Sequence, residues 1–208
     1  MKIKDILFED FVNYKKASMF ISMGECDWKC CKEQNIDISI CQNSELANMT
    51  DIDIDLQKIV DLYMYNPITE AIVIGGLEPF YNSKDLLDLI TLFRKFTLDD
   101  IVIYTGYYPY EICDELIYLS KFDNIIIKFG RFIPNQDKHV DNLLKVELAS
   151  DNQYAVKLNK NTESIIQAMK DNDGYCPCMI NKNNNTKCCC LTFRNQSSGN
   201  CHCGIFNK

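Results

Sequence analysis

Cysteines are the residues in this sequence whose type and spacing point most directly to chemistry. The chain has twelve of them, and seven lie between Cys176 and Cys203 in three clusters, each of which holds a C-x-C pair. A second group comprises Cys26, Cys30, Cys31 and Cys41. Thiolates at such spacing bind metals or iron–sulfur clusters, or they react as redox-active thiols.

The compartment decides between these chemistries and structural disulfides. The start, "MKIKDILFEDFVNYKKASMF", has no long apolar core of a signal peptide, and no apolar run approaches the roughly 18 residues of a transmembrane helix. We therefore expect a cytoplasmic protein that does not bind membranes. Thiols stay reduced there, so clustered cysteines favour metal binding or catalysis.

Charge is distributed unevenly along the chain. The net charge is −7, yet residues 176–208 contain four basic and no acidic residues, which leaves about −11 for the rest. An acidic chain is not expected to bind nucleic acid in general. The basic tail suits an anionic cluster and an acidic protein partner.

The elements that must position these cysteines alternate between strand and helix patterns. Strands are expected at residues 17–24, 70–76, 100–106, 124–130 and 144–150, and helices at residues 53–65, 83–96, 108–120 and 161–171. Ser83 is the expected N-cap of the second helix. The alternation predicts an α/β fold with parallel strands and crossover helices.

Function is expected in the loops that follow the strands. These loops are "GECDWKCC", "GGLEPF" and "YTGYYP", which parallel strands bring to the same edge of a sheet. After Gly174 the sequence becomes cysteine-rich coil. We expect two domains, residues 1–158 and residues 159–208, the second a small cysteine-rich α+β iron–sulfur domain.

Four stretches in the first domain resemble a known family. "CDWKC", "GGLEPF", "IYTGY" and "IIIKFGRF…LASDNQY" occur in the order found in the activating enzyme of the anaerobic (class III) ribonucleotide reductase, a member of the radical S-adenosylmethionine (SAM) superfamily. The resemblance covers roughly residues 15–158. It implies a partial parallel (β/α) barrel, a 4Fe-4S cluster, and cleavage of SAM to a 5′-deoxyadenosyl radical that abstracts hydrogen from a glycine of the partner reductase.

The resemblance also implies ligands for the cluster, with one departure. The superfamily's usual third cysteine would fall at position 33, which is Glu33. We therefore expect the ligands Cys26, Cys30 and Cys41, with Cys31 as the alternative to Cys30. A third interpretation is that these are ordinary buried thiols, as we expect for Cys113.

SAM would meet the glycine-rich loop. The resemblance implies contacts from Gly75, Gly76 and Glu78. Trp28 or Tyr107 would stack on adenine, although either side chain could equally serve packing.

The tail resembles the catalytic chain of ferredoxin–thioredoxin reductase. "CPC" (176–178) and "CHC" (201–203) match its pattern, and "CCC" (188–190) stands where Cys-Pro-Cys is expected. The implied ligands of a second 4Fe-4S cluster are Cys176, Cys188, Cys190 and Cys201. The implied active-site disulfide joins Cys178 and Cys203, with His202 as proton donor. Cys189 has no counterpart. In an extended C-x-C pair the two sulfurs would point to opposite sides.

Together these features predict an oxidoreductase with two clusters and SAM as cofactors. The expected partners are ferredoxin or flavodoxin as electron donor, a thioredoxin- or glutaredoxin-like protein, and the anaerobic ribonucleotide reductase. One alternative keeps only the tail as an enzyme, with the α/β domain as a docking or electron-conduit module. Another is a zinc-stabilised adaptor, in which four of the tail cysteines, or a set that includes His202, supply the ligands.

Overall fold

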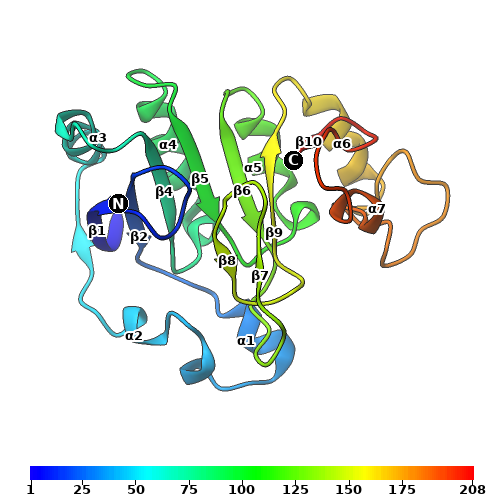
Figure 1. The fold of residues 1–208 in the computed structure, drawn as a ribbon, viewed down its shortest axis with the longest axis horizontal. Coiled ribbons are helices and arrows are strands. Elements are labelled where there is room, and N and C mark those ends of the chain that lie inside the picture. Colours follow the sequence, from blue (N-terminus) through cyan, green and yellow to red (C-terminus); the bar gives the residue numbers. More distant parts are fainter.

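An eight-stranded mixed sheet forms the centre of the computed structural model, which describes residues 1–208 (Figure 1). Its strand order is β10-β9-β6-β5-β4-β2-β1-β3. The central strands β2 (Ser18–Met23), β4 (Ala71–Gly76), β5 (Asp100–Tyr104) and β6 (Ile125–Phe129) are parallel. The outer strands are antiparallel to their neighbours: β1 (Lys2–Asp10), β3 (Ile52–Asp53), β9 (Tyr154–Leu158) and β10 (Phe206–Asn207). The expected α/β class is confirmed.

The central strands are apolar on both faces, because each face is covered. Ile72 and Ile74 of β4 belong to the core between the sheet and the helices, whereas Ala71 and Val73 face the opposite side. On that second side the short hairpin of β7 (His139–Val140) and β8 (Glu147–Leu148) packs through Leu148. Burial on two faces explains the continuous apolar runs that marked these strands in the sequence.

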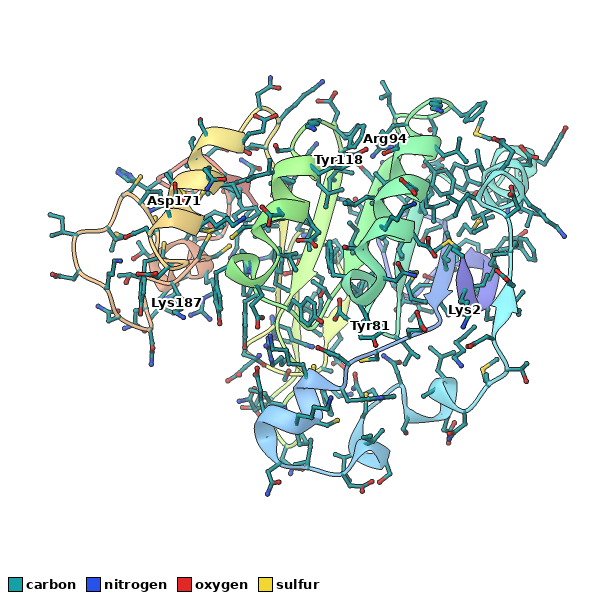
Figure 2. The ribbon with its side chains drawn as sticks, turned by 180° about the vertical axis from the view of Figure 1, so that it is seen from behind. Lys2, Tyr81, Arg94, Tyr118, Asp171 and Lys187 are labelled. Atoms are coloured by element: carbon teal, nitrogen blue, oxygen red, sulfur yellow. The ribbon has the colours of Figure 1, made fainter.

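Helices cover the first face of the sheet. They are α3 (Leu56–Tyr65), α4 (Ser83–Phe93), α5 (Cys113–Leu119) and α6 (Glu163–Asp171), and each contacts the next in that order. Figure 2 shows this face, with Arg94 at the end of α4 and Tyr118 on α5. The Tyr118 hydroxyl lies 2.9 Å from the Thr91 hydroxyl of α4, which ties the two helices together. None of the helices is long and apolar enough to span a membrane.

Most expected elements are confirmed, and three expectations are wrong. The helix expected at residues 108–120 is divided into the 3-10 helix η3 (Pro109–Glu111) and α5. Residues 144–150 supply only β8, and the strand that extends the sheet is β9, because the apolar side chains of the earlier stretch cover the sheet instead of entering it. Ser83 does not cap α4, since the helix continues directly from η2 (Pro79–Asn82) and Asn82 occupies the capping position without a side-chain hydrogen bond.

The two cysteine-rich regions occupy different places in the molecule. The first follows β2, where α1 (Lys29–Gln34), η1 (Ile38–Ile40) and α2 (Ser44–Ala47) lie beyond the carboxyl ends of the central strands (Figure 1). The tail carries α7 (Leu191–Arg194) and packs beside β9 and α6. The expected boundary after residue 158 coincides with the end of β9, and the tail returns to the sheet because β10 pairs with β9.

Candidate iron–sulfur sites

The four cysteines of the first group line one cavity. Cys26, Cys30, Cys31 and Cys41 share a cavity of about 500 Å³ with residues from the ends of β4, β5 and β6. A volume of this size is typical of small-molecule and cofactor sites. The loop after β2 thus brings all four thiols to the strand ends where the sequence placed function.

Trp28 shapes the loop that carries these thiols. Its backbone is left-handed, with φ of 60°, and it stands immediately before α1. Its N–H group donates a hydrogen bond to the Sγ atom of Cys26 over 3.2 Å. This turn separates Cys26 from the helix, while Cys30 and Cys31 lie in the first turn of α1. The C-x3-C spacing is therefore folded so that Cys26 and Cys30 face the same cavity.

One ligand position of the first site has two neighbouring candidates, Cys30 and its alternative Cys31. Cys31 is buried, and burial together with the neighbouring Cys41 raises its pKa, while Cys30 and Cys41 are partly exposed. Burial raises the pKa of Cys30; a hydrogen bond from the backbone of Phe132 and the charges of Arg131 and Lys128 oppose this rise. Those cations favour the thiolate that a metal binds. Gly106 also leaves room for Cys30, because a Cβ atom there would come within 2.7 Å of its sulfur.

Glu33, at the position where a cysteine was expected, is held by an ion pair. Its Oε2 atom lies 2.5 Å from Nε of Arg131, and the same guanidinium donates two hydrogen bonds to Glu111, over 2.7 and 2.8 Å. Lys29 also pairs with Glu111. Arg131 therefore anchors α1 to η3, so that Glu33 positions the loop.

The glycine-rich loop presents a buried carboxylate to the cavity. Glu78 accepts hydrogen bonds from the Thr105 hydroxyl over 2.7 Å and from the Gly106 N–H over 2.9 Å. Burial raises its pKa to about 7, although these bonds favour the ionised form. Gly76 has φ of +78° and a Cβ atom there would lie 2.8 Å from Leu46, so the turn requires glycine. Gly76 and Glu78 line the cavity; Gly75 instead packs between Phe20 and Tyr104.

The two aromatic candidates for adenine stacking lie differently. Trp28 lines the cavity, whereas Tyr107 donates a hydrogen bond over 2.9 Å to Asp27 and so supports the cysteine loop. Lys128 lines the cavity too, and the sequence reading missed it. The missed signal was a charged residue inside the apolar run "NIIIKFG", because a lysine is rarely buried without a role.

The tail gathers six of its seven cysteines around a second, small cavity. Its lining consists of Cys176, Cys188, Cys189, Cys190, Phe193, Cys201, His202, Cys203 and Phe206. The neighbouring thiols of Cys190 and Cys203 lower the pKa of Cys176. The four expected ligands are buried, while Cys178 is exposed and Cys203 is half-buried. All twelve cysteines are free thiols in this structure.

The expectation of extended C-x-C pairs is wrong. Cys176 and Cys178 lie in a turn closed by a bond from the Met179 N–H to the Cys176 carbonyl over 3.1 Å. A similar turn joins Cys201 and Cys203, whose sulfurs are 3.5 Å apart. Pro177 and Gly204 favour such turns. The sulfurs of Cys201 and Cys203 therefore stay on the same side, whereas Cys176 is buried and Cys178 is exposed. His202 is exposed at the second turn.

Cys189, which had no expected role, faces the sheet. Its N–H group donates a hydrogen bond over 3.4 Å to the hydroxyl of Tyr154, the first residue of β9. Tyr154 in turn packs against Phe129 of β6, with ring centroids 6.0 Å apart. The middle cluster of the tail is thus attached to the sheet through Cys189.

The side chains around both cavities are of the type that binds iron–sulfur clusters, because each cavity is lined by at least three thiols. Cations lie near Cys30 at the first cavity, and a backbone N–H group donates a hydrogen bond to Cys201 at the second. No group of three or more His, Cys, Asp or Glu side chains is arranged to hold a single metal ion. A cubic four-iron cluster is wider than one ion, and its ligands stand farther apart.

The fold and the first site define an α/β protein with a thiol-lined cavity at the strand ends. The family model of the 4Fe-4S single cluster domain matches residues 15–155, about two-thirds of the chain. The chain belongs to this iron–sulfur family, which indicates a 4Fe-4S cluster and a redox function. The matched range includes the first cysteine group and none of the tail cysteines. No curated protein and no solved structure matches the chain.

Proposed function

We propose that the chain is a redox enzyme with two iron–sulfur sites and two activities. The larger region, a partial barrel of radical SAM type, would cleave SAM reductively and so activate the glycyl radical of an anaerobic ribonucleotide reductase. The observation that carries this proposal is the shared cavity. It brings the cysteine loop, the Gly76–Glu78 turn and the Thr105–Gly106 segment together at the strand ends.

The residues of the cavity have separate tasks in this proposal. Cys26, Cys30 and Cys41 would hold the cluster, with Cys31 as the alternative to Cys30. A bound cluster would supply one electron for cleavage of SAM. Glu78 and the backbone of the glycine-rich loop would bind the amino group of SAM, and Lys128 offers a buried cation for its carboxylate. The enclosing loop would keep water from the radical.

The tail would reduce a disulfide of a thioredoxin- or glutaredoxin-like partner. Cys176, Cys188, Cys190 and Cys201 would hold the second cluster, and Cys178 and Cys203 would be the reactive pair. The burial of the first four and the exposure of Cys178 support this division. Two electrons, delivered singly by ferredoxin or flavodoxin, and two protons convert the tail disulfide to two thiols. The Cys178 thiolate would then attack the target disulfide, and Cys203 would release the reduced partner.

Two assays on the anaerobically reconstituted full chain test the proposal. The first measures 5′-deoxyadenosine formed from SAM with a low-potential reductant, and the second measures thiols formed on a thioredoxin-type disulfide. We expect Cys41→Ala to abolish only the first activity and Cys178→Ser only the second. Cys113→Ala is the matched control, because that thiol is buried on α5 and lines neither cysteine cavity, so this variant should retain both activities.

The outcomes separate the two halves of the proposal. No 5′-deoxyadenosine from the wild-type chain with iron bound would remove the SAM activity and leave a disulfide reductase with an α/β docking module. No reduction of the disulfide would remove the activity of the tail.

A further inference from the structure

A second large cavity lies between the sheet and the tail, apart from both cysteine groups. Its volume is about 740 Å³, and no cysteine lines it. Three segments form its walls: residues 139–145 around β7, residues 151–155 at the start of β9, and the tail residues 191–198 with Lys208. Only five of its eighteen lining residues are hydrophobic, so a polar ligand fits this cavity better than an apolar one.

Three cations line this cavity without an acidic partner. Lys145, Arg194 and Lys208 form no ion pair with any carboxylate of the chain. The side chain of Arg194 only rests against the ring of Tyr154, 5.7 Å from its centroid, and makes no hydrogen bond. By contrast, Arg131 at the first site forms ion pairs with both Glu33 and Glu111. Unpaired cations around a cavity favour an anionic ligand.

Two carboxylates also line the cavity, and one of them already accepts hydrogen bonds from the backbone. Asp141 accepts hydrogen bonds from the backbone N–H groups of Leu143, Leu144 and Ala155, each over 2.9 Å. Asp151 is exposed and has no cationic partner. Its carboxylate can accept hydrogen bonds from the neutral part of a ligand. The amides and hydroxyls of other lining residues can both donate and accept them: Asn142, Asn195, Gln196, Ser197 and Ser198.

Independently of the proposed function, we propose that this cavity binds a nucleoside phosphate. Its phosphate would contact Arg194, Lys208 and Lys145, and the hydroxyl and amino groups of the nucleoside would meet the polar side chains around them. The volume lies within the range of roughly 300–1,000 Å³ that small-molecule sites occupy.

Such a ligand would hold together two arms of the tail, namely α7 and the segment that runs from Cys201 to Lys208. Arg194 belongs to α7, which follows Cys190 directly, and Lys208 follows β10, which is preceded by Cys201 and Cys203. The arms already meet here, since Lys208 Nζ donates hydrogen bonds to the carbonyls of Arg194 and Gln196 over 2.5 and 3.2 Å. A phosphate on both cations would reinforce this contact and hold the cysteine clusters in place.

Calorimetric titration of the full chain with ATP, at constant ionic strength, tests the proposal. We expect saturable binding of one ATP per chain. Arg194→Gln and Lys145→Gln should each weaken it about tenfold, the equivalent of one charge-assisted hydrogen bond. Lys145 is in a turn outside the tail, so its variant tests the site even if Arg194→Gln disturbs the tail. Lys182→Gln is the control, because Lys182 is a tail cation outside the cavity and should bind ATP as the wild type does.

Inorganic phosphate, titrated into the same proteins, should bind more weakly than ATP, because it reaches the cations without the surrounding polar groups. The proposal is overturned if ATP does not bind saturably, if Arg194→Gln and Lys145→Gln retain wild-type affinity, or if phosphate binds as tightly as ATP.

Discussion

Lys128 shows at the scale of a residue how an apolar strand can carry a functional side chain. It is buried in β6, and burial lowers its pKa to about 8. Its Nζ atom lies 3.4 Å from the carbonyl oxygen of Gly130 and 5.9 Å from the centre of the Tyr104 ring. A buried cation with one long hydrogen bond is poorly satisfied on its own, so a bound carboxylate would complete its partners.

We expect Lys128→Met to weaken SAM binding to the reconstituted protein at least about tenfold, because a hydrogen bond to a charged group contributes roughly 1.5–3 kcal/mol. The iron content should not change, since methionine fills a similar volume and Lys128 is no cluster ligand. Equilibrium binding of SAM measures the effect. Lys84→Met, on the exposed face of α4, is the control. Equal affinity in wild type and Lys128→Met would show that the lysine does not meet SAM.

The 3-10 helix η3 is the element that joins the two cysteine-rich regions. On one side Glu111 pairs with Arg131 and with Lys29 of α1. On the other side the ring of Tyr110 lies 4.4 Å from Nζ of Lys187, the residue before Cys188. A segment of three residues, with Tyr108 stacked on Tyr110 at 5.6 Å, thus contacts both the cysteine loop and the tail.

The ion network at η3 makes stability depend on pH. Burial alone would raise the pKa of Glu111, but hydrogen bonds from Arg131 and Lys29 lower it to about 2. An acid whose folded pKa is lowered stabilises the fold above its unfolded pKa of about 4.5, and this stabilisation is lost as the pH falls towards 2.

Glu111→Gln should therefore cost about 1–2 kcal/mol of unfolding free energy at pH 7, less than the full shift would give because the network is partly open to solvent. The difference from wild type should shrink between pH 5 and pH 3, as measured by urea unfolding of the metal-free chain. Asp88→Asn removes an exposed ion pair on α4 and should show a difference near zero throughout. If the difference in unfolding free energy between wild type and Glu111→Gln stayed constant or increased as the pH fell, Glu111 would not stabilise the fold through this ion network.

Sequence periodicity predicted the central elements better than the outer ones, for a physical reason. Strands such as β4 are buried on both faces, and their unbroken apolar runs stand out. β1, which lies between β2 and the edge strand β3, has an irregular burial pattern and was not recognised. The strand β9 was not recognised either, because its sequence YAVKL has no unbroken run of large apolar residues. The spacing of the cysteines predicted the two groups that line the two cavities. Their contacts could not be predicted, because the Cys31–Cys41 pair and the turns at Pro177 and Gly204 depend on how loops fold against the sheet.

At the scale of the whole molecule, the tail is attached to the main sheet at several points. β10 pairs with β9 and extends the sheet, and the Tyr154 hydroxyl accepts a hydrogen bond from the Cys189 N–H group. The Lys187 ammonium group makes a cation–π contact with the ring of Tyr110. The tail and the larger region share one hydrophobic core, which includes Phe129, Phe193 and Phe206. Two iron–sulfur regions would thus be carried on one rigid sheet.

Removing the contact at Tyr110 should loosen the tail alone. We expect Lys187→Met to speed amide hydrogen exchange of residues 174–190 about fivefold, which corresponds to the roughly 1 kcal/mol of a cation–π contact, while exchange in β5 and β6 is unchanged. Lys182→Met is the matched control, because Lys182 contacts only Asp173 and Tyr175 within the tail and its vicinity. Equal exchange in both variants would mean that Lys187 does not dock the tail.

The central claim, that one chain holds two separate iron–sulfur sites, is tested most directly by counting iron and sulfide per chain after anaerobic reconstitution. The proteins to compare are the wild type, Cys26→Ala in the first region and Cys188→Ala in the tail. We expect about eight irons in the wild type and about four in each variant, since a 4Fe-4S cluster contains four. Zinc without iron in anaerobically purified protein, or a wild-type count near four that Cys188→Ala leaves unchanged, would contradict the account.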